Sequence, residues 1–383
     1  MSQNFTICTI IKNEEKNLDR FLSALKKHKL LNQLLIADTG SSDKSLQLLQ
    51  KHGITPLVYE WQEDFAAAKN FVAEKAATDW ILLLDADEFL EKMDLNFIQQ
   101  WLRKNQEQPS ALPPLGRIRR VNETPKGNRS EKITRFYNKK YFHYEGKIHE
   151  QLTPVKPEER AVHSYDLPVQ IFHVGYRAGI VKDKALRDLR LLEKEISETK
   201  LCKLDGTDIS VQKSTEKSSE NEDKLSYLYY NAGRCHRILE DNEAAKASYE
   251  KALQISQPSG SLHSWQRDLI DDYAYCLMDL KKNEEALAIE NYYDQACDRA
   301  DYLLALGLVY MHNNRLNDAL MAFTLASETP DAAAEGANSY LPLYNAGLIY
   351  EFSGNTPMAI KTYERAKTFP DAKKRLNLLR RMP

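Results

Sequence analysis

Short apolar runs alternate with amphipathic helical patterns along the chain up to about residue 100. The apolar runs predict strands at residues 5–11, 34–37, 55–59 and 80–84. Helical patterns with one apolar face lie between them, around residues 18–25, 46–49 and 65–77. This order predicts a parallel sheet with helices on both faces, and such sheets bind ligands beyond the carboxyl ends of their strands.

The pattern changes in residues 116–176, where short aromatic and basic segments indicate hairpin-like strands and loops that complete a first domain. A helix is expected again at residues 181–199. Residues 203–224 are polar and carry few apolar side chains, so we interpret them as a mobile insertion or linker.

Beyond Ser226 the sequence repeats itself. In three units a glycine is followed at offsets of 12, 16 and 19 by a small residue, an aromatic residue and another small residue. The glycines and their aromatic partners are Gly233 with Tyr249, Gly307 with Phe323, and Gly347 with Tyr363. These offsets are typical of tetratricopeptide repeats, and a degenerate fourth unit surrounds Ala274 and Ala286. We therefore divide the chain into a first domain at 1–180, a helix and polar linker at 181–225, and a repeat domain at 226–383.

Composition narrows the class of protein. The 383 residues include 53 Lys and Arg against 55 Asp and Glu, which argues against wholesale binding of nucleic acid. No apolar run approaches the roughly 18 residues of a membrane helix, so a soluble chain without a membrane span is expected. The five cysteines form neither a disulfide framework nor a metal-binding pattern, which favours a cytoplasmic location.

Three polar clusters follow three of the predicted strands. They lie at residues 12–15, 38–43 and 85–88, and they are expected to converge on one edge of the sheet. In an extended segment Asp85 and Asp87 would face the same way and present two carboxylates to one Mg²⁺ or Mn²⁺ ion. Such ions complete their coordination with phosphate oxygens, so a phosphate-bearing substrate is implied.

Each of these polar residues also has a purely structural interpretation. Asp38 and Asn13 have groups that can hydrogen-bond a nucleoside, but Asp38 can equally accept hydrogen bonds from the amides of its own turn. Ser41 or Ser42 can cap the next helix, and Asp64 is expected to cap the helix that starts at residue 65. Lys69 either reaches a pyrophosphate or is simply exposed.

The motifs TIIKNEE, IADTGSSDKS, WQEDFAAAKN and LLLDADE, in this order and spacing, resemble those of family 2 glycosyltransferases. The resemblance covers the first 180 residues and implies an α/β fold of the GT-A, or Rossmann-like, nucleotide-sugar-binding class, followed by an all-α repeat domain. A glycosyltransferase domain joined to tetratricopeptide repeats is similar to the sublancin-type peptide S-glycosyltransferases that modify bacteriocin precursors. It is also similar to a wider set of bacterial enzymes with no assigned acceptor.

The resemblance implies roles for individual residues. Asp38 would contact the uracil and ribose, and Asp85 and Asp87 the metal and diphosphate. The region of Asp64 and Lys69 would contact the nucleotide phosphates, although arginine is common at the Lys69 position in relatives. The segment ending in His-Glu, together with IFHVGY, adds site candidates at Arg135, His149, Glu150 and His173. The residues expected to bind nucleotide-sugar are Asn13, Glu15, Asp38, Lys69, Asp85, Ala86 and Arg135. The expected metal ligands are Asp85, Asp87 and His173.

Inverting sugar transfer needs a base to remove the proton of the acceptor and a cation to stabilise the leaving diphosphate. Glu150 is the favoured base, with His149 and Asp87 as further catalytic candidates. The stretch from Arg117 to Lys147 holds ten Lys or Arg against three Glu, and it is either a wall that attracts diphosphate or a solvated basic loop.

The sequence therefore predicts a metal-dependent enzyme that moves a sugar, expected to be UDP-linked, to a peptide or protein acceptor. The concave surface of a repeat array suits a peptide, and the same surface can also form a homodimer. The alternatives are a transferase acting on a cell-surface glycan or lipopolysaccharide-type acceptor, and an inactive repeat scaffold.

Overall fold

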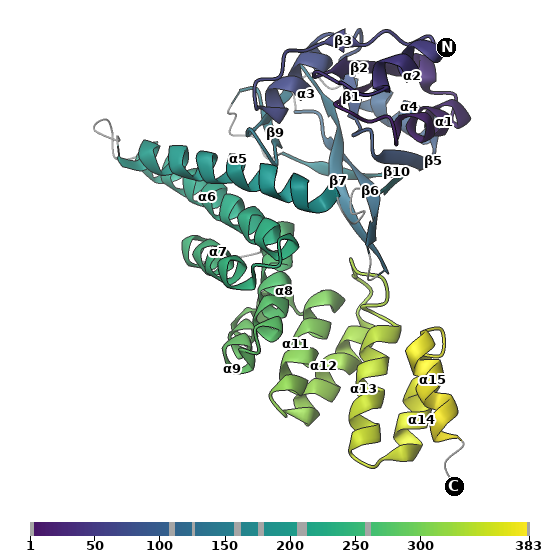
Figure 1. Cartoon of the computed structure of the whole chain (residues 1–383), viewed down its shortest axis with the longest axis vertical. Coiled ribbons are helices and arrows are strands. Elements are labelled where there is room, and N and C mark those ends of the chain that lie inside the picture. Colours follow the sequence, from purple (N-terminus) through teal and green to yellow (C-terminus); the bar gives the residue numbers. More distant parts are fainter. Residues whose placement is uncertain are drawn as a thin grey trace. The chain divides into compact units, whose positions relative to one another are not determined.

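The computed structural model describes residues 4–106, 112–124, 127–156, 162–174, 180–204, 213–256 and 262–380. The chain divides into two compact units, Met1–Ile180 and Val181–Pro383 (Figure 1). Among the described residues, no helix combines the length and apolar character needed to cross a membrane.

The first unit is built on a mixed sheet, which has eight strands in the described part of the chain and the order β3-β2-β1-β4-β7-β6-β10-β5. The first four of these strands are parallel to one another and match the four expected from the sequence. They are β1 (Thr6–Ile11), β2 (Leu34–Asp38), β3 (Leu57–Val58) and β4 (Trp80–Leu83). The expected α/β fold is confirmed, but β7 runs antiparallel to β4, so the sheet is mixed.

Two apolar clusters cover the two faces of this sheet. Along β4 the alternate residues Trp80 and Leu82 belong to one cluster, and Ile81 and Leu83 belong to the other. Both faces are buried, which explains why β4 reads as a continuous apolar run. The first cluster includes the apolar faces of α1 (Leu18–Lys27) and α4 (Leu95–Gln106), and the second includes that of α3 (Phe65–Glu74). A short helix, α2 (Ser45–Lys51), and the 3₁₀ helix η1 (Leu31–Gln33) complete this half.

The hairpin-like strands expected in residues 116–176 are present. They are β6 (Leu115–Thr124), β7 (Gly127–Asn138), β8 (Phe142–Glu145), β9 (Gln151–Pro154) and β10 (Ser164–His173). Strand β6 pairs with β7 antiparallel and with β10 parallel, and β10 pairs with β5 (Glu88–Met93), which directly follows the 85–87 turn. Strands β8 and β9 form a separate two-stranded ribbon. The basic stretch therefore lies, through β7, beside β4, the strand that precedes the Asp-x-Asp motif, and β10 separates it from β5.

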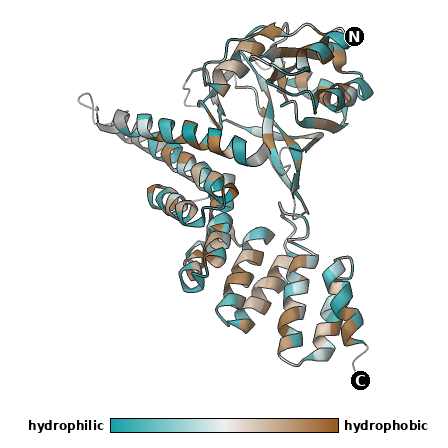
Figure 2. Ribbon diagram, in the orientation of Figure 1, coloured by the Kyte–Doolittle hydropathy of each residue, from teal (hydrophilic) through white to brown (hydrophobic). Residues whose placement is uncertain are grey.

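The second unit is helical. It begins with α5 (Ile180–Leu204) and α6 (Lys213–Ile238), so residues 213–224 of the expected polar linker are helical instead, and residues 205–212 lie outside the described residues. Figure 2 shows hydrophobic and hydrophilic residues alternating along the helices of this unit, as amphipathic helices require. The remaining helices are α7 (Asn242–Ile255), α8 (Ser264–Asp279), α9 (Asn283–Ala286), η2 (Leu287–Tyr292), α10 (Tyr293–Ala296), α11 (Ala300–His312), α12 (Leu316–Glu328), α13 (Tyr340–Phe352), α14 (Thr356–Arg365) and α15 (Pro370–Leu379).

The repeat pattern is confirmed by close contacts within each helix pair. In α6 and α7, in α11 and α12, and in α13 and α14, the repeat glycine lies against the aromatic residue 16 positions later. A Cβ atom at Gly307 would lie 2.5 Å from the ring of Phe323, so only glycine allows the two helices to approach this closely. In the degenerate unit, α9, η2 and α10 replace a continuous second helix.

Candidate functional site

The loops after β1 and β2 are locked together by hydrogen bonds between side chains and backbone. Asn13, whose backbone φ is 59°, accepts hydrogen bonds from the amides of Ser42 at 2.7 Å and Asp43 at 3.3 Å. The carboxylate of Glu15 accepts from the amide of Lys44 at 3.1 Å. The side-chain oxygens of Asn13 and Glu15 therefore shape the neighbouring loop at the carboxyl edge of the sheet.

Asp38 ends β2 and is buried. Its carboxylate accepts hydrogen bonds from the amides of Gly40 and Ser41, both at 3.2 Å. This is the turn-stabilising role that the sequence left as the alternative to nucleoside binding. The serine-capping alternative is wrong, because the first amide of α2, that of Ser45, donates to Asp43 Oδ1 at 2.9 Å. The hydroxyl of Ser41 instead accepts from the amide of Asn13 at 3.0 Å.

Lys69 is placed by α3 and is buried rather than exposed. The helix begins where Asp64 caps it by accepting a hydrogen bond from the amide of Ala67 at 2.8 Å, as expected. The Lys69 ammonium donates to Glu150 and lies 3.4 Å from Asp85 Oδ1. Burial alone would lower the pKa of Lys69, but the two carboxylates outweigh it and raise that pKa above its usual value.

Arg135 on β7 connects Asp85 to Glu88. One guanidinium nitrogen, Nη2, donates to Asp85 Oδ2 at 2.8 Å and to Glu88 Oε1 at 2.7 Å. Burial disfavours a charged arginine, but the two carboxylates outweigh it and raise the pKa of Arg135 well above its usual value. Burial would likewise raise the pKa of Asp85, whereas Lys69 and Arg135 hold it well below its usual range. Asp85 is therefore ionised, and it is the most exposed of the three, with 34% of its side chain accessible against 5% for Lys69 and 9% for Arg135.

The Asp-x-Asp segment departs from the expectation. The residues after β4 do not stay extended, because the amide of Glu88 donates to the carbonyl of Asp85 at 2.9 Å and closes a tight turn. The two carboxylates consequently engage different partners: Asp85 lies with Lys69 and Arg135, and Asp87 faces His173. Ala86 between them is buried. The structure thus gives no basis for a single cation held by both aspartates.

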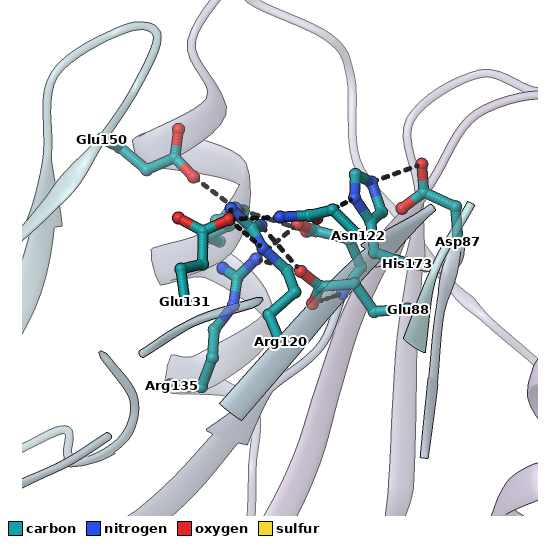
Figure 3. Close-up of polar contacts among 10 residues, drawn as sticks. Asp87, Glu88, Arg120, Asn122, Glu131, Arg135, Glu150 and His173 are labelled. Atoms are coloured by element: carbon teal, nitrogen blue, oxygen red, sulfur yellow. Dashed lines mark hydrogen bonds and ion pairs between the residues drawn. The ribbon is translucent and has the colours of Figure 1, made fainter. Parts of the chain in front are cut away.

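His173 lies at the end of β10 between Asn122 and Asp87 (Figure 3). Its Nδ1 is 2.8 Å from Asn122 Oδ1, and its Nε2 is 3.5 Å from Asp87 Oδ2. Within the described residues, no group of three or more His, Cys, Asp or Glu side chains is arranged to hold a metal ion. Asp87 offers a carboxylate, which suits Mn²⁺ or Mg²⁺, and His173 offers an imidazole, while substrate phosphates can supply further oxygen ligands.

Glu150 and His149 lie on the segment between β8 and β9. The Glu150 carboxylate reaches the Lys69 ammonium, and 12% of its side chain is accessible. His149 is half-buried and has a left-handed backbone with φ of 51°.

Four members of the polar network were given no individual role in the sequence analysis. Glu88 is fully buried and accepts hydrogen bonds from Arg135, from Arg120 at 3.1 Å, and from the amide of Asp85 at 3.1 Å. Arg120, Asn122 and Glu131 extend the network toward His173 (Figure 3). Arg120 and Asn122 are two residues apart on β6 and so share one face of the strand. The spacing of Arg120 and Asn122 could have been recognised in the sequence, but their cross-strand contact with Glu131 could not.

Comparison with known proteins identifies the domains. Residues 6–155 match the family model described as glycosyl transferase family 2, and residues 226–258 and 342–369 match a tetratricopeptide repeat model. A TPR repeat-containing protein of Synechococcus elongatus is 36% identical over 109 residues, which cover 28% of this chain and 25% of that protein. The SPbeta prophage-derived glycosyltransferase SunS of Bacillus subtilis is 24% identical over 195 residues, which cover 48% of this chain and 43% of SunS.

The chain thus spans less than half the length of these two curated relatives. Among solved structures, the match to TarS of S. aureus covers 76% of this chain and 55% of the TarS chain. The identity is 11% and the TM-score is 0.37, so this likeness does not bear on function. The family match covers the sheet that carries the polar network except for β10, and the repeat matches cover the Gly233–Tyr249 and Gly347–Tyr363 contacts. The chain therefore carries a family 2 glycosyltransferase domain followed by tetratricopeptide repeats.

Proposed function

We propose that this protein transfers a sugar, with inversion, from a nucleotide-sugar to a peptide or protein acceptor, and that a divalent metal assists the reaction. The observation that carries the proposal is the pairing of Asp87 with His173 at 3.5 Å, next to the Lys69–Asp85–Arg135 network. All of these residues except His173 lie within residues 6–155, which match the family 2 model. A UDP-sugar is the donor expected from the sequence resemblance.

Asp87 and His173 would hold the metal, Mn²⁺ or Mg²⁺. A carboxylate and an imidazole leave several coordination positions for diphosphate oxygens, which fits a metal that arrives with the donor. When bound, the metal would supply positive charge that stabilises the leaving nucleoside diphosphate. Asp85, the other metal ligand expected from the sequence, belongs instead to the salt-bridge network.

Asp85 is the member of that network that a donor would meet, because Lys69 and Arg135 are more deeply buried. An ionised carboxylate only accepts hydrogen bonds, so its natural partners are the hydroxyl groups of the ribose or of the transferred sugar. Lys69 and Arg135 then act by holding Asp85 charged and in place. In the proposal, Asn13, Glu15, Asp38 and the Ala86 backbone form the nucleoside side of the site.

Glu150 is the proposed base. Its carboxylate lies beside the Lys69 ammonium, and a carboxylate is a group that can take the proton of the acceptor as it attacks the sugar. His149, the neighbouring residue, remains a candidate for contact with the donor or acceptor.

A peptide acceptor is proposed because repeats accompany the transferase domain and because the motif order resembles that of the sublancin-type enzymes. Full-length protein, a UDP-sugar and a set of peptides containing Cys, Ser, Thr or Asn should give a peptide whose mass rises by one hexosyl or N-acetylhexosaminyl group. Transfer to glycan acceptors alone would favour the cell-surface alternative.

Donor hydrolysis tests the enzymatic role without knowledge of the acceptor. UDP release from a panel of UDP-sugars with Mn²⁺ should fall by at least about 10-fold in Asp87→Ala, as expected for loss of a metal ligand. Asp19→Ala removes a carboxylate that is 60% exposed on α1 and should release UDP at the wild-type rate. Equal release by wild type and Asp87→Ala would refute the assigned role.

A further inference from the structure

A hydrogen-bonded relay crosses adjacent strands of the first unit and ends at His173. On β6 and β7, Arg120 is directly opposite Glu131, and on β6 and β10, Asn122 is directly opposite His173. The pairing register places the four side chains on one face of the sheet, in two neighbouring cross-strand rows (Figure 3). The relay is therefore fixed by the backbone hydrogen bonds of the sheet rather than by a loop.

Each member of the relay restricts the next through its hydrogen-bonding chemistry. A guanidinium only donates, and Arg120 donates to Glu131 Oε1 through Nε at 3.1 Å and Nη2 at 2.9 Å. An ionised carboxylate only accepts, so the group that Asn122 turns toward Glu131, 2.6 Å away, must be its NH₂. The orientation of the Asn122 amide, which is often ambiguous, is thereby settled.

Because the NH₂ of Asn122 faces Glu131, its carbonyl oxygen faces His173. An oxygen only accepts here, so the Nδ1 atom of His173, 2.8 Å away, must carry a proton whether the ring is neutral or charged. In the neutral ring the lone pair is then on Nε2, which is directed at Asp87 Oδ2. The Nε2 lone pair and the Asp87 carboxylate together attract positive charge, supplied either by a proton on Nε2 or by a metal ion.

We propose that Asn122, oriented by Glu131 and Arg120, is a positioning residue that fixes the tautomer of His173 with its proton on Nδ1. The fixed tautomer presents the Nε2 lone pair, together with the Asp87 carboxylate, to a divalent cation. The metal part of this inference rests on the proposed function, whereas the tautomer part depends only on the geometry of the relay. Second partners that orient a ligating histidine typically change metal affinity by about 10- to 100-fold.

The first measurement is the tautomer of His173 in the full-length protein without metal. Long-range ¹H–¹⁵N NMR correlation separates the two neutral tautomers, and a His173→Gln variant identifies the signals. The wild type should show the proton on Nδ1. A wild-type spectrum with the proton of the neutral ring on Nε2 would overturn the proposal, and this result needs no relay variant to fold.

The second measurement uses Asn122→Leu, which removes the amide but leaves the Arg120–Glu131 pair. The variant should lose the preference for Nδ1–H and bind Mn²⁺ about 10- to 100-fold more weakly, measured by electron paramagnetic resonance of free Mn²⁺ in the presence of UDP. The matched control is Gln170→Leu, which removes an amide on the same strand as His173 whose contact is Glu91, at 2.8 Å. The control should keep both the tautomer and the affinity.

The outcomes test the positioning role of Asn122 and the metal-binding role of His173 separately. An unchanged tautomer and unchanged Mn²⁺ affinity in Asn122→Leu would refute the positioning role. A wild-type Nδ1–H tautomer without any Mn²⁺ binding would refute the proposed metal function and the metal part of this inference, and it would leave the relay as the control of the tautomer alone. A lost tautomer preference with weakened Mn²⁺ binding supports the whole inference.

Discussion

Replacing Glu88 by glutamine tests whether the buried network holds the site together. The wild-type side chain accepts hydrogen bonds at both oxygens: Oε1 from Arg135 and Arg120, and Oε2 from the amide of Asp85. Glutamine has the same shape but only one acceptor oxygen. Whichever way its amide turns, its NH₂ faces at least one of these three donors, and the two arginines lose a compensating charge.

The expected cost follows from the chemistry of that site. A hydrogen bond to a charged group contributes about 1.5–3 kcal/mol, and removal of one partner from a buried ion pair costs about 3–5 kcal/mol. Because Arg135 keeps Asp85 and Arg120 keeps Glu131, we expect a loss near the lower end, about 3 kcal/mol. The same change should weaken UDP binding, since Glu88 fixes the Asp85 turn.

Urea unfolding measured by tryptophan fluorescence provides the assay. A Trp265→Phe background leaves Trp61, Trp80 and Trp101, which all lie in the first unit, so the signal reports that unit alone. Glu91→Gln, an exposed change on the same strand, should alter the unfolding free energy by less than about 0.5 kcal/mol. A loss below about 1 kcal/mol for Glu88→Gln would refute the reasoning.

Three further perturbations have defined outcomes. The lowered pKa of Asp85 contributes stability that is present above about pH 4 and is lost as the pH falls toward the folded-state pKa. The Asp85→Asn variant should therefore lose less unfolding free energy between pH 5 and pH 3 than the wild type, as measured by urea unfolding at each pH. Gly307→Ala should cost about 1–3 kcal/mol in thermal unfolding, and less in a Phe323→Leu background; equal costs would contradict the close contact. Asn13→Gly keeps the left-handed backbone but removes the acceptor for the Ser42 amide, so that amide should exchange hydrogen faster, and unchanged exchange would refute the loop lock.

The sequence predicts the elements of the fold better than their contacts. Apolar runs locate the first four strands, and β4 most clearly, because a strand buried on both faces has little choice of residue, as Trp80 to Leu83 show. The repeats are recognisable because the contact between Gly307 and Phe323 demands a fixed offset within one helix pair. Residues 213–224 were misjudged, because a polar segment can continue a long helix that is anchored elsewhere.

The sequence identified several residues of the site but not how they contact one another. The positions of Lys69, Asp85 and Arg135 were all identified, but their mutual ion pairs depend on the packing of α3, β4 and β7, which no local pattern encodes. The turn at Asp85 separates it from Asp87, and a period-two argument cannot detect that turn. The relay through Glu131 and Asn122 depends on the register of β6 and β7, which is a tertiary property.

Titration of the full-length protein with UDP in a calorimeter, with Mn²⁺ and then with a chelator, tests the central claim most directly. If Asp87 and His173 bind the donor diphosphate through a cation, Mn²⁺ should tighten UDP binding to the wild type by at least about 10-fold and leave the affinity of Asp87→Asn unchanged. Equal UDP affinity with and without Mn²⁺ in the wild type would contradict the account.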